Sequence, residues 1–339
     1  MHVESGDAGE RDDRGEQQRE RFRRRQHDIG RIAALTLALA ALTYTTAFRW
    51  TNVTGGEDGR IAVWRRGAAQ PQHVFIGHTA PVAALAISPD GKRIASGSWD
   101  RTVRLWPSDG GDAQVLEGHQ QNVNGVAFTP DSKSLVSVSH DPQLRIWPLD
   151  GGIPVVVTLV TPLNSVAVAN DGEIVAGAAD GKALFFSQVG ELRGELAAAE
   201  TPVVSVAVST DGRFVAAASI RGSVSIIDRA SRALLRTLVG PGLPVWAAVF
   251  LPDNRTIITG GTDRIVRRWD ALTGDHIGTV PMNSIDDPLA AYAGDRGAEI
   301  YRACVACHTL TPDEGNRAGP TLHGIFGRKI ASLANYGFS

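Results

Sequence analysis

The stretch GHTAPVAALAISPDGKRIASGSWDRTVRLW, residues 77–106, contains three short segments with β-strand character. VAALAIS, RIASGS and TVRLW are five to seven residues long and rich in aliphatic and β-branched side chains, as strands are. SPDGK lies between the first two segments, and Pro, Asp and Gly in this order favour tight turns. The stretch therefore predicts short antiparallel strands joined by hairpin turns.

A pattern of this kind recurs through the middle of the chain. Each copy of the pattern ends at a large apolar residue. These residues are Trp64, Trp106, Trp147, Phe186, Ile227 and Trp269, and the distances between successive ones are 42, 41, 39, 41 and 42 residues. Six residues before each stand Asp58, Asp100, Asp141, Asp180, Arg221 and Asp263. Turn signals nine or ten residues earlier are centred on Asp90, Asp131, Asp171, Asp211 and Asp253. Such a period of short strands and turns predicts an all-β propeller over residues 51–281, with six visible repeats.

Residues 77–106 and 118–147 resemble the repeat of the WD40 family, the second stretch reading GHQQNVNGVAFTPDSKSLVSVSHDPQLRIW. In that family a His, a Ser or Thr, an Asp and a Trp of one blade form a buried hydrogen-bonded set. The resemblance implies two such sets, namely His78, Ser96, Asp100 and Trp106, and His119, Ser137, Asp141 and Trp147. The later repeats lack the Gly-His pair, so we expect their blades to depend on apolar packing.

A His and an Asp near a Ser could also be interpreted as catalytic. These residues recur at the blade period, however, whereas a nucleophile is needed once, so the structural interpretation is favoured. The sequence has no G-x-S-x-G, no H-E-x-x-H and no phosphate-binding Gly-Lys loop. Its charge is nearly balanced, with 34 Lys and Arg against 36 Asp and Glu, which gives no global basic surface for nucleic acid. We predict no catalytic residue and expect the propeller to be a binding surface.

The chain before the repeats falls into two parts. Residues 1–31 are charged and are expected to be disordered. An apolar run over 32–48 follows a basic stretch, the layout of a secretion signal or a membrane anchor, although 17 residues barely span a bilayer. A buried strand or helix at the edge of the propeller is the alternative. The innermost strand of the first blade should lie around residues 38–46, so the first repeat is expected to be incomplete.

The two cysteines of the chain lie close together and far from the repeats. Cys304 and Cys307 are three residues apart, and His308 follows directly. C-x-x-C alone would suit a redox pair, half of a zinc site or a disulfide, but the βαβ context of thioredoxins and further Cys ligands are lacking. C-x-x-C-H is the attachment pattern of c-type haem, in which two thiols bond to the haem and the imidazole ligates the iron. The sequence therefore predicts one covalently attached haem c.

The surroundings of this motif resemble class I cytochrome c. GDRGAEIYRACVACHTL (294–310) looks like the first helix of that family with its haem attachment, and RAGPTLHGIFGRKI (317–330) matches the loop that follows. The resemblance implies a small α-helical cytochrome c-like domain after the propeller, over residues 290–339. It stops at the end of the sequence, so the domain is expected to be partial and the chain to be a fragment or a mis-terminated gene product.

The resemblance also assigns roles within this segment. The carbonyl of Pro320 would accept a hydrogen bond from the ring of His308, and Arg328 would approach a haem propionate. We interpret His323 as a structural loop residue rather than an iron ligand. Family members carry a methionine as sixth ligand, and no methionine follows His308 in this sequence.

Together these features favour an electron carrier over a catalyst. In this interpretation the haem iron cycles between two oxidation states, and a redox partner protein docks on the propeller or at the haem edge. Two alternatives stay open: an interaction scaffold with a vestigial cytochrome portion, and an oxidoreductase in which the c haem is the electron entry. Because the resemblance implies haem attachment outside the cytoplasm, we expect a periplasmic bacterial protein, secreted or anchored through residues 32–48.

Overall fold

A computed structural model describes the repeat region of the chain. The described residues are 51–55, 59–65, 70–239, 242–262 and 265–281, with the short pieces 295–296 and 322–323. The expectations for residues 1–31, for 32–48 and for the cytochrome-like segment 290–339 lie outside these residues, apart from the two short pieces. No helix in the described part is long and apolar enough to cross a membrane.

The described repeat region is built from 23 strands in six antiparallel sheets, and in each sheet the strands follow chain order. The first sheet contains β1 (Thr51–Gly55), β2 (Ile61–Arg65) and β3 (His73–Phe75). The second contains β4 (Val82–Ile87), β5 (Arg93–Ser98), β6 (Val103–Pro107) and β7 (Gln114–Leu116). The third contains β8 (Val123–Phe128), β9 (Ser134–Ser139), β10 (Gln143–Pro148) and β11 (Val155–Thr158).

The remaining sheets repeat this four-stranded plan. The fourth contains β12 (Leu163–Val168), β13 (Ile174–Ala178), β14 (Lys182–Phe186) and β15 (Leu192–Ala197). The fifth contains β16 (Val203–Val208), β17 (Phe214–Ser219), β18 (Ser223–Asp228) and β19 (Ala233–Val239). The sixth contains β20 (Val245–Phe250), β21 (Thr256–Gly261), β22 (Ile265–Asp270) and β23 (His276–Pro281).

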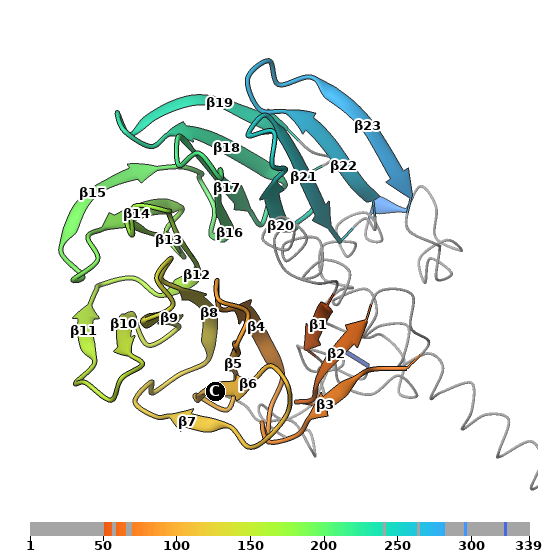
Figure 1. The fold of residues 1–339 in the computed structure, drawn as a ribbon. Helices are drawn as coiled ribbons and strands as arrows, with labels where there is room; N and C mark the ends of the chain where they lie inside the picture. The colour runs from red at the N-terminus through yellow and green to blue at the C-terminus, as the bar shows by residue number, and fades with distance from the viewer. Residues whose placement is uncertain are drawn as a thin grey trace, which may run out of the picture.

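The six sheets follow one another around a common centre, as blades do (Figure 1). In the four-stranded sheets the first strand is innermost, and β4, β8, β12, β16 and β20 contact one another in succession. The outermost strands, among them β7, β11, β15 and β19, lie at the rim. The predicted all-β propeller is therefore confirmed for the described residues.

The first sheet is the incomplete one. Trp64 on β2 corresponds to Trp106 on β6. The backbone of Asn52 on β1 pairs with that of Trp64, just as the backbone of Ile94 on β5 pairs with that of Trp106. β1 also contacts β4 in the way that β5 contacts β8. β1 therefore corresponds to the second strand of a blade, and the described part of this sheet has no innermost strand. The expected position of that strand, residues 38–46, is outside the described residues.

The turns between the first and second strands explain why the sequence signals recur. In the β4–β5 turn the Ser88 hydroxyl donates to Asp90 at 2.6 Å, and the same carboxylate accepts from the backbone of Lys92 at 3.0 Å. The backbone of Arg93 returns a bond to the Ser88 hydroxyl at 2.9 Å. The short Asp side chain thus closes the hairpin on its own backbone, as turn aspartates do. Equivalent Asp bonds occur at Asp131, Asp171, Asp211 and Asp253.

The core lies between neighbouring sheets rather than at the centre of the ring. One cluster joins Val136 and Leu144 of the third sheet to Ile174 and Phe186 of the fourth, and all four are 0% exposed. Burying an aliphatic side chain of this size contributes about 1.5–3 kcal/mol. Ile227, at the Trp position of the fifth sheet, is also 0% exposed. Apolar side chains therefore fill the places that Trp106 and Trp147 take elsewhere.

Every innermost strand of the four-stranded sheets carries a register shift near its start, for example between Val123 and Gly125. The residue at the shift is Asn124 in β8, and its side-chain amide donates to the carbonyl of Leu163 at 3.1 Å. Asn164 in β12 donates in the same way to the carbonyl of Val203 at 3.1 Å. The bulge thus aims a side chain at the next sheet, which helps to fix the spacing of the blades.

Candidate functional site

The predicted haem residues cannot be placed by geometry. Cys304, Cys307 and His308 lie outside the described residues, as do Pro320 and Arg328. His323 belongs to a described piece and is exposed. Within the described residues, no group of three or more His, Cys, Asp or Glu side chains is arranged to hold a metal ion. The donors that the sequence supplies there are two thiols and an imidazole.

The first predicted hydrogen-bonded set is present in the second sheet. The ring of His78 lies between Asp100, 2.8 Å from Nδ1, and Ser96, 2.7 Å from Nε2. Because an ionised carboxylate can only accept, Nδ1 donates to Asp100 and the Ser96 hydroxyl donates to Nε2. The indole Nε1 of Trp106 donates to the Ser96 oxygen at 2.9 Å. One continuous chain of bonds therefore connects the loop before β4 to β6.

The third sheet repeats the arrangement almost atom for atom. His119 lies 3.0 Å from a carboxylate oxygen of Asp141 and 2.8 Å from the Ser137 hydroxyl, and Trp147 donates to that hydroxyl at 2.8 Å. Burial lowers the pKa of His119, and the nearby Asp141 offsets this only in part. Folding therefore favours the neutral form of the ring.

Asp100 is the most bonded member of the first set. It accepts from His78, from the Thr102 hydroxyl at 2.7 Å and from the backbone of Thr102 and Thr79. Burial acts to raise the pKa of Asp100, but these hydrogen bonds outweigh it and hold the pKa far below its usual value. Ser96 is 0% exposed, so the set is buried and hydrogen-bonded as the resemblance implied.

The later sheets depart from the expectation of apolar packing in one respect. In the sixth sheet Trp269 donates to the Thr259 hydroxyl at 3.0 Å, which keeps the Trp half of the set. The expectation of purely apolar packing was wrong for this sheet. Thr259 lies ten residues before Trp269, as Ser96 lies before Trp106, and the bond between them forms without a histidine. Phe186 and Ile227 follow the expectation.

A cluster of charges joins the fourth and fifth sheets, and the sequence did not reveal it. Glu173, after the β12–β13 turn, accepts from Arg229 at 2.9 Å and from Arg232 at 3.0 Å, both in the β18–β19 turn. Arg229 also pairs with Asp171 at 2.6 Å, and Arg232 lies 4.0 Å from the ring centre of Phe185. We call Asp171, Glu173, Arg229 and Arg232 the inter-blade ion cluster. It holds two turns of adjacent blades together.

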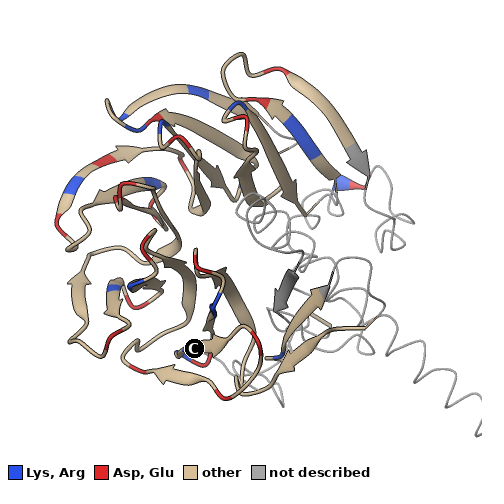
Figure 2. Cartoon of the chain, in the orientation of Figure 1, with Lys and Arg blue, Asp and Glu red and all other residues tan. Residues whose placement is uncertain are grey.

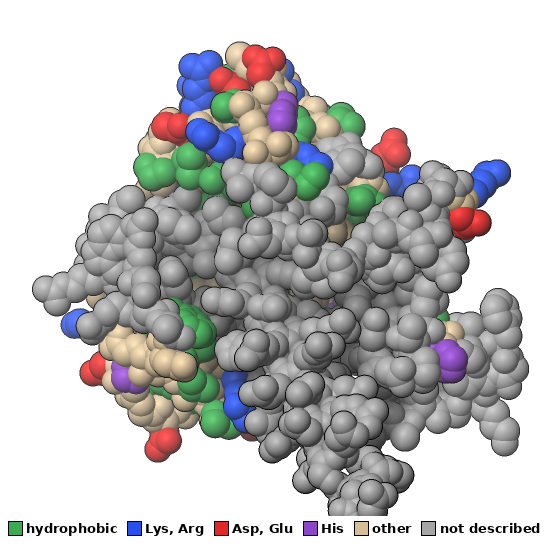
Figure 3. Space-filling model, turned by 90° about the vertical axis from the view of Figure 1, so that its right-hand side faces the viewer, with side chains coloured by type: hydrophobic (Ala, Val, Ile, Leu, Met, Phe, Trp, Pro, Cys, Tyr) green, Lys and Arg blue, Asp and Glu red, His purple; other side chains and the backbone are tan. Residues whose placement is uncertain are grey.

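Elsewhere the charges of the described surface are mixed. Lys and Arg alternate with Asp and Glu along the outer strands and turns (Figure 2). The described part of the face in Figure 3 likewise mixes basic, acidic and apolar side chains. Interspersed charges of this kind favour solubility rather than a strong field of one sign.

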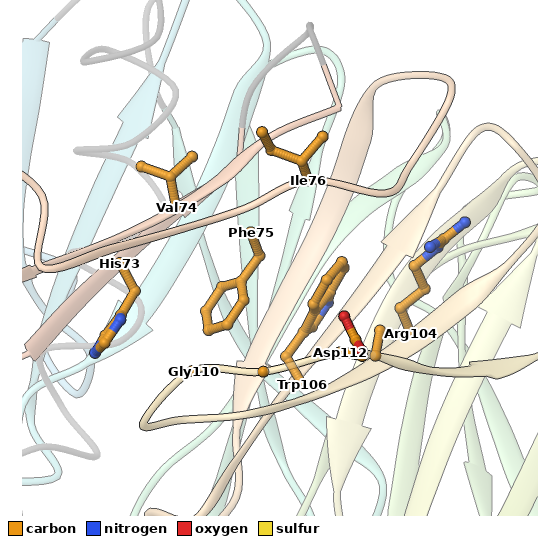
Figure 4. A pocket seen from close by; sticks show the side chains of 10 residues that line it. His73, Val74, Phe75, Ile76, Arg104, Trp106, Gly110 and Asp112 are labelled. Atoms are coloured by element: carbon orange, nitrogen blue, oxygen red, sulfur yellow. The ribbon is translucent and has the colours of Figure 1, made fainter.

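A pocket of about 520 Å³ lies between the first and second sheets. Its walls come from β3, from β6 and from the β6–β7 turn at Gly110 and Gly111 (Figure 4). Phe75 and Trp106 are packed against each other there, with ring centres 5.1 Å apart. Arg104 and Asp112 supply its charges. Sequence reasoning missed this pocket, and no motif marks it: Arg104, Arg145 and Arg267 all stand two residues before a repeat tryptophan.

The repeats match a known family model. The WD domain, G-beta repeat (WD40) model matches residues 69–107, 110–148, 188–228 and 232–270. Each match begins near the outermost strand of one sheet and ends at the third strand of the next. Each repeat therefore connects two neighbouring blades.

Three relatives illustrate the similarity to individual proteins. Cytochrome c of Cochliobolus lunatus is 49% identical over 45 residues, which are 13% of this chain and 42% of that protein. Cytochrome c2 of Blastochloris viridis is 33% identical over 52 residues, 15% of this chain and 41% of that protein. The small ribosomal subunit protein RACK1 of Candida albicans is 37% identical over 76 residues, 22% of each chain.

These matches are partial on both sides. The chain spans about two fifths of the length of the cytochromes that it matches, and about a fifth of the RACK1 protein. The chain thus carries WD40 repeats, together with a short region that is similar to cytochrome c.

Proposed function

We propose that this chain is a c-type haem electron-transfer protein whose WD40 blades form a docking scaffold for a redox partner protein. The observation that carries the proposal is the C-x-x-C-H motif at residues 304–308, in a chain with a region 49% identical to cytochrome c over 45 residues. Two thiols and an adjacent imidazole are the donors that c-type haem requires. A bound haem would supply reversible one-electron transfer.

The residues of the chain have separate roles in this proposal. Cys304 and Cys307 hold the haem covalently, and His308 ligates its iron. The carbonyl of Pro320 orients the His308 ring, and Arg328 pairs with a propionate. Hydrogen-bonded partners of this kind set the basicity of a ligating imidazole. No residue is assigned to catalysis, because the buried sets in the blades are structural.

The blades support the scaffold part of the proposal through their rigidity. Ser96 and Ser137 are 0% exposed and fully bonded, and the cores lie between adjacent sheets. A frame of this kind keeps its surface loops in fixed relative positions, as docking requires. The compartment proposed with it is the bacterial periplasm, with the chain secreted or anchored through residues 32–48.

The test is covalent haem in the chain with and without its thiols. The full chain, expressed with periplasmic haem-attachment machinery, should give a pyridine haemochrome spectrum of c type, and its haem should resist extraction into acidified acetone. A Cys304→Ala, Cys307→Ala double variant should release all of its haem. Covalent haem in the double variant, or none in the parent chain, would overturn the assignment.

Redox titration then separates the carrier from a scaffold with a vestigial cytochrome portion. Reversible reduction and oxidation of the attached haem supports the carrier. A chain that folds but never takes up haem would be such a scaffold instead. Haem reduction that depends on an added organic substrate, with no partner protein present, would favour an oxidoreductase.

A further inference from the structure

The edge of β1 that faces the centre of the ring carries no strand among the described residues. In the second sheet β5 pairs with β4 on its inner edge and with β6 on its outer edge. β1 takes the place of such a second strand and contacts β4, but its one described pairing partner is β2, on the outer edge (Figure 1). An unpaired edge is a row of backbone N–H and C=O groups ready to accept a further strand. The first sheet therefore has a place for an innermost strand.

The innermost strands of the other five sheets share a six-residue pattern. Each begins with Val or Leu, has Ala, Gly or Ser at its third place and ends with Ile, Phe or Val; the sequences are VAALAI, VNGVAF, LNSVAV, VVSVAV and VWAAVF. The third place is small because the next innermost strand lies close: a Cβ atom added to Gly125 would lie 3.1 Å from the backbone nitrogen of Val166. The residue at the first place is buried in all five strands, with exposed fractions from 0% to 7%. Packing between the blades therefore sets the pattern.

One segment before β1 has this pattern at a matching distance. LAALTY, residues 39–44, begins with Leu, has Ala at its third place and ends with a large aromatic residue. In the five four-stranded sheets the last residue of the innermost strand precedes its pairing partner by six or seven residues, as Ile87 precedes Ile94. Asn52 of β1 corresponds to Ile94, and LAALTY ends eight residues before it, so the connecting turn is one residue longer. IAALTL, residues 32–37, has the same pattern but ends 15 residues before Asn52. The pattern and the spacing together select residues 39–44.

We propose that residues 39–44 form the innermost strand of the first sheet, antiparallel to β1, with Tyr44 opposite Asn52. This strand pairs with the inner edge of β1 and adds a sixth innermost strand to the ring, beside β4. A strand within the blades and a membrane anchor are exclusive uses of the same residues. The strand therefore excludes anchoring of the chain through residues 32–48, whereas the haem assignment does not depend on it.

A disulfide across the two strands tests both their pairing and its register. The backbone bond that closes the β4–β5 hairpin, 2.9 Å from nitrogen to oxygen, lies one residue beyond the pair Ile87 and Ile94. That pair is therefore a non-hydrogen-bonded one, in which opposite side chains lie closest. The corresponding pair in the first sheet is Tyr44 and Asn52. Cysteines at these two positions should meet the geometry that a disulfide needs.

The experiment uses the full-length double variant in which both native cysteines are replaced by Ala. With Tyr44→Cys and Asn52→Cys added, mild oxidation should give an intrachain disulfide, seen as two linked peptides after tryptic cleavage at Arg49. The control carries Tyr44→Cys with Val53→Cys; a shift of one residue moves the side chain to the other face of a strand, so this pair should stay reduced. A disulfide in both variants, or in neither, would overturn the proposal. A disulfide that joins two chains would also overturn it, in favour of a second copy as the occupant of this edge.

Leu39→Asp gives a second measurement, in the full chain with its own cysteines. Leu39 takes the first place of the pattern, which the other sheets bury, so the charge should displace the strand and speed amide exchange in β1 by at least about tenfold. Leu35→Asp, four residues earlier in the same apolar run, is the matched control and should leave this exchange unchanged. Equal exchange in the two variants is the result expected of an anchor and would contradict the strand. Neither experiment measures haem attachment, so a failure here would leave the electron-transfer proposal standing.

Discussion

At the scale of single residues, Ser96 and Ser137 explain why a histidine, an aspartate and a tryptophan recur together. Each hydroxyl donates to a histidine and accepts from an indole, so both of its bonding capacities are used in a site from which water is excluded. Removing any member leaves its neighbours buried with unmet hydrogen bonds. The energetic consequence can be measured one residue at a time.

Asp100→Ala should lower the free energy of unfolding by about 1–3 kcal/mol, because His78 and Thr102 lose a buried acceptor. Urea denaturation followed by circular dichroism measures the loss. Asp109→Ala, at an exposed position in the next turn, is the control and should leave the midpoint in place. Equal stability of the two variants would contradict the role of the bonded set. The haem spectrum of the folded Asp100→Ala protein should be unchanged.

His119 should make stability depend on pH. Burial lowers its pKa in the folded protein, so the unfolded chain takes up the proton first as the pH falls below the ordinary value of 6.5. Its contribution is therefore complete above pH 6.5 and is lost as the pH falls from there toward the folded pKa. The slope attributable to one such proton is at most about 1.4 kcal/mol per pH unit.

Unfolding midpoints measured across this interval, for the parent and for His119→Gln, give the test. The variant should be less stable at neutral pH but should show a shallower slope. His140→Gln changes an exposed histidine nearby and should keep the slope of the parent. A parent whose midpoint does not change between neutral and mildly acidic pH would rule out this effect.

At the scale of elements, the inter-blade ion cluster joins hairpin turns from two sheets. Glu173→Gln should lower the free energy of unfolding by about 1–3 kcal/mol, since Arg232 then loses its charged partner. The loss is smaller than for a fully buried pair because Arg229 and Arg232 are 17% and 25% exposed. Thermal unfolding in low and high salt would show whether the interaction is screened.

The exposed pair Lys182–Glu195 supplies the comparison within the same sheet. Glu195→Gln should produce no measurable change in the unfolding midpoint, because the side chains of Lys182 and Glu195 are both exposed to water, at 37% and 50%. If Glu173→Gln and Glu195→Gln behave alike, the cluster does not stabilise the contact between the blades.

The strands and turns could be predicted from the sequence, but the contacts between blades could not. Asp90 closes its turn through bonds to residues two positions away, so the signal is local and recurs with the repeat. Glu173 and Arg232 are 59 residues apart, and the pair occurs once, so no periodicity marks it. Thr259 could not be predicted for a related reason: the Gly-His pair marks the whole set, whereas the bond from Trp269 to Thr259 forms without that pair.

At the scale of the whole molecule, the propeller should fold without the haem. The core clusters of the described residues, from Ile61 to Ala271, are made by side chains of neighbouring blades packed on one another. Hydrogen exchange in β4–β19 should therefore be the same in the parent chain and in the Cys304→Ala, Cys307→Ala variant. Faster exchange in the variant would show that the haem segment supports the blades.

The haem residues were predicted from the spacing of two thiols and a histidine, which is a chemical signal that needs no fold. The pocket between the first two sheets could not be predicted in that way. Arg104 and Arg145 look alike in sequence, and only their surroundings differ: a Gln143 that bonds one and a Thr102 that turns to Asp100.

The uneven distribution of the bonded sets has a consequence for temperature. The second and third sheets rely partly on hydrogen bonds through Ser96 and Ser137, whereas the fourth and fifth place Phe186 and Ile227 at the equivalent point. Apolar burial weakens on cooling, because its driving force near room temperature is largely entropic. Near the freezing point the two halves of the ring should therefore differ in local stability, with β12–β19 opening more readily than β4–β11. One chain would thus have a side that tolerates cold and a side that does not.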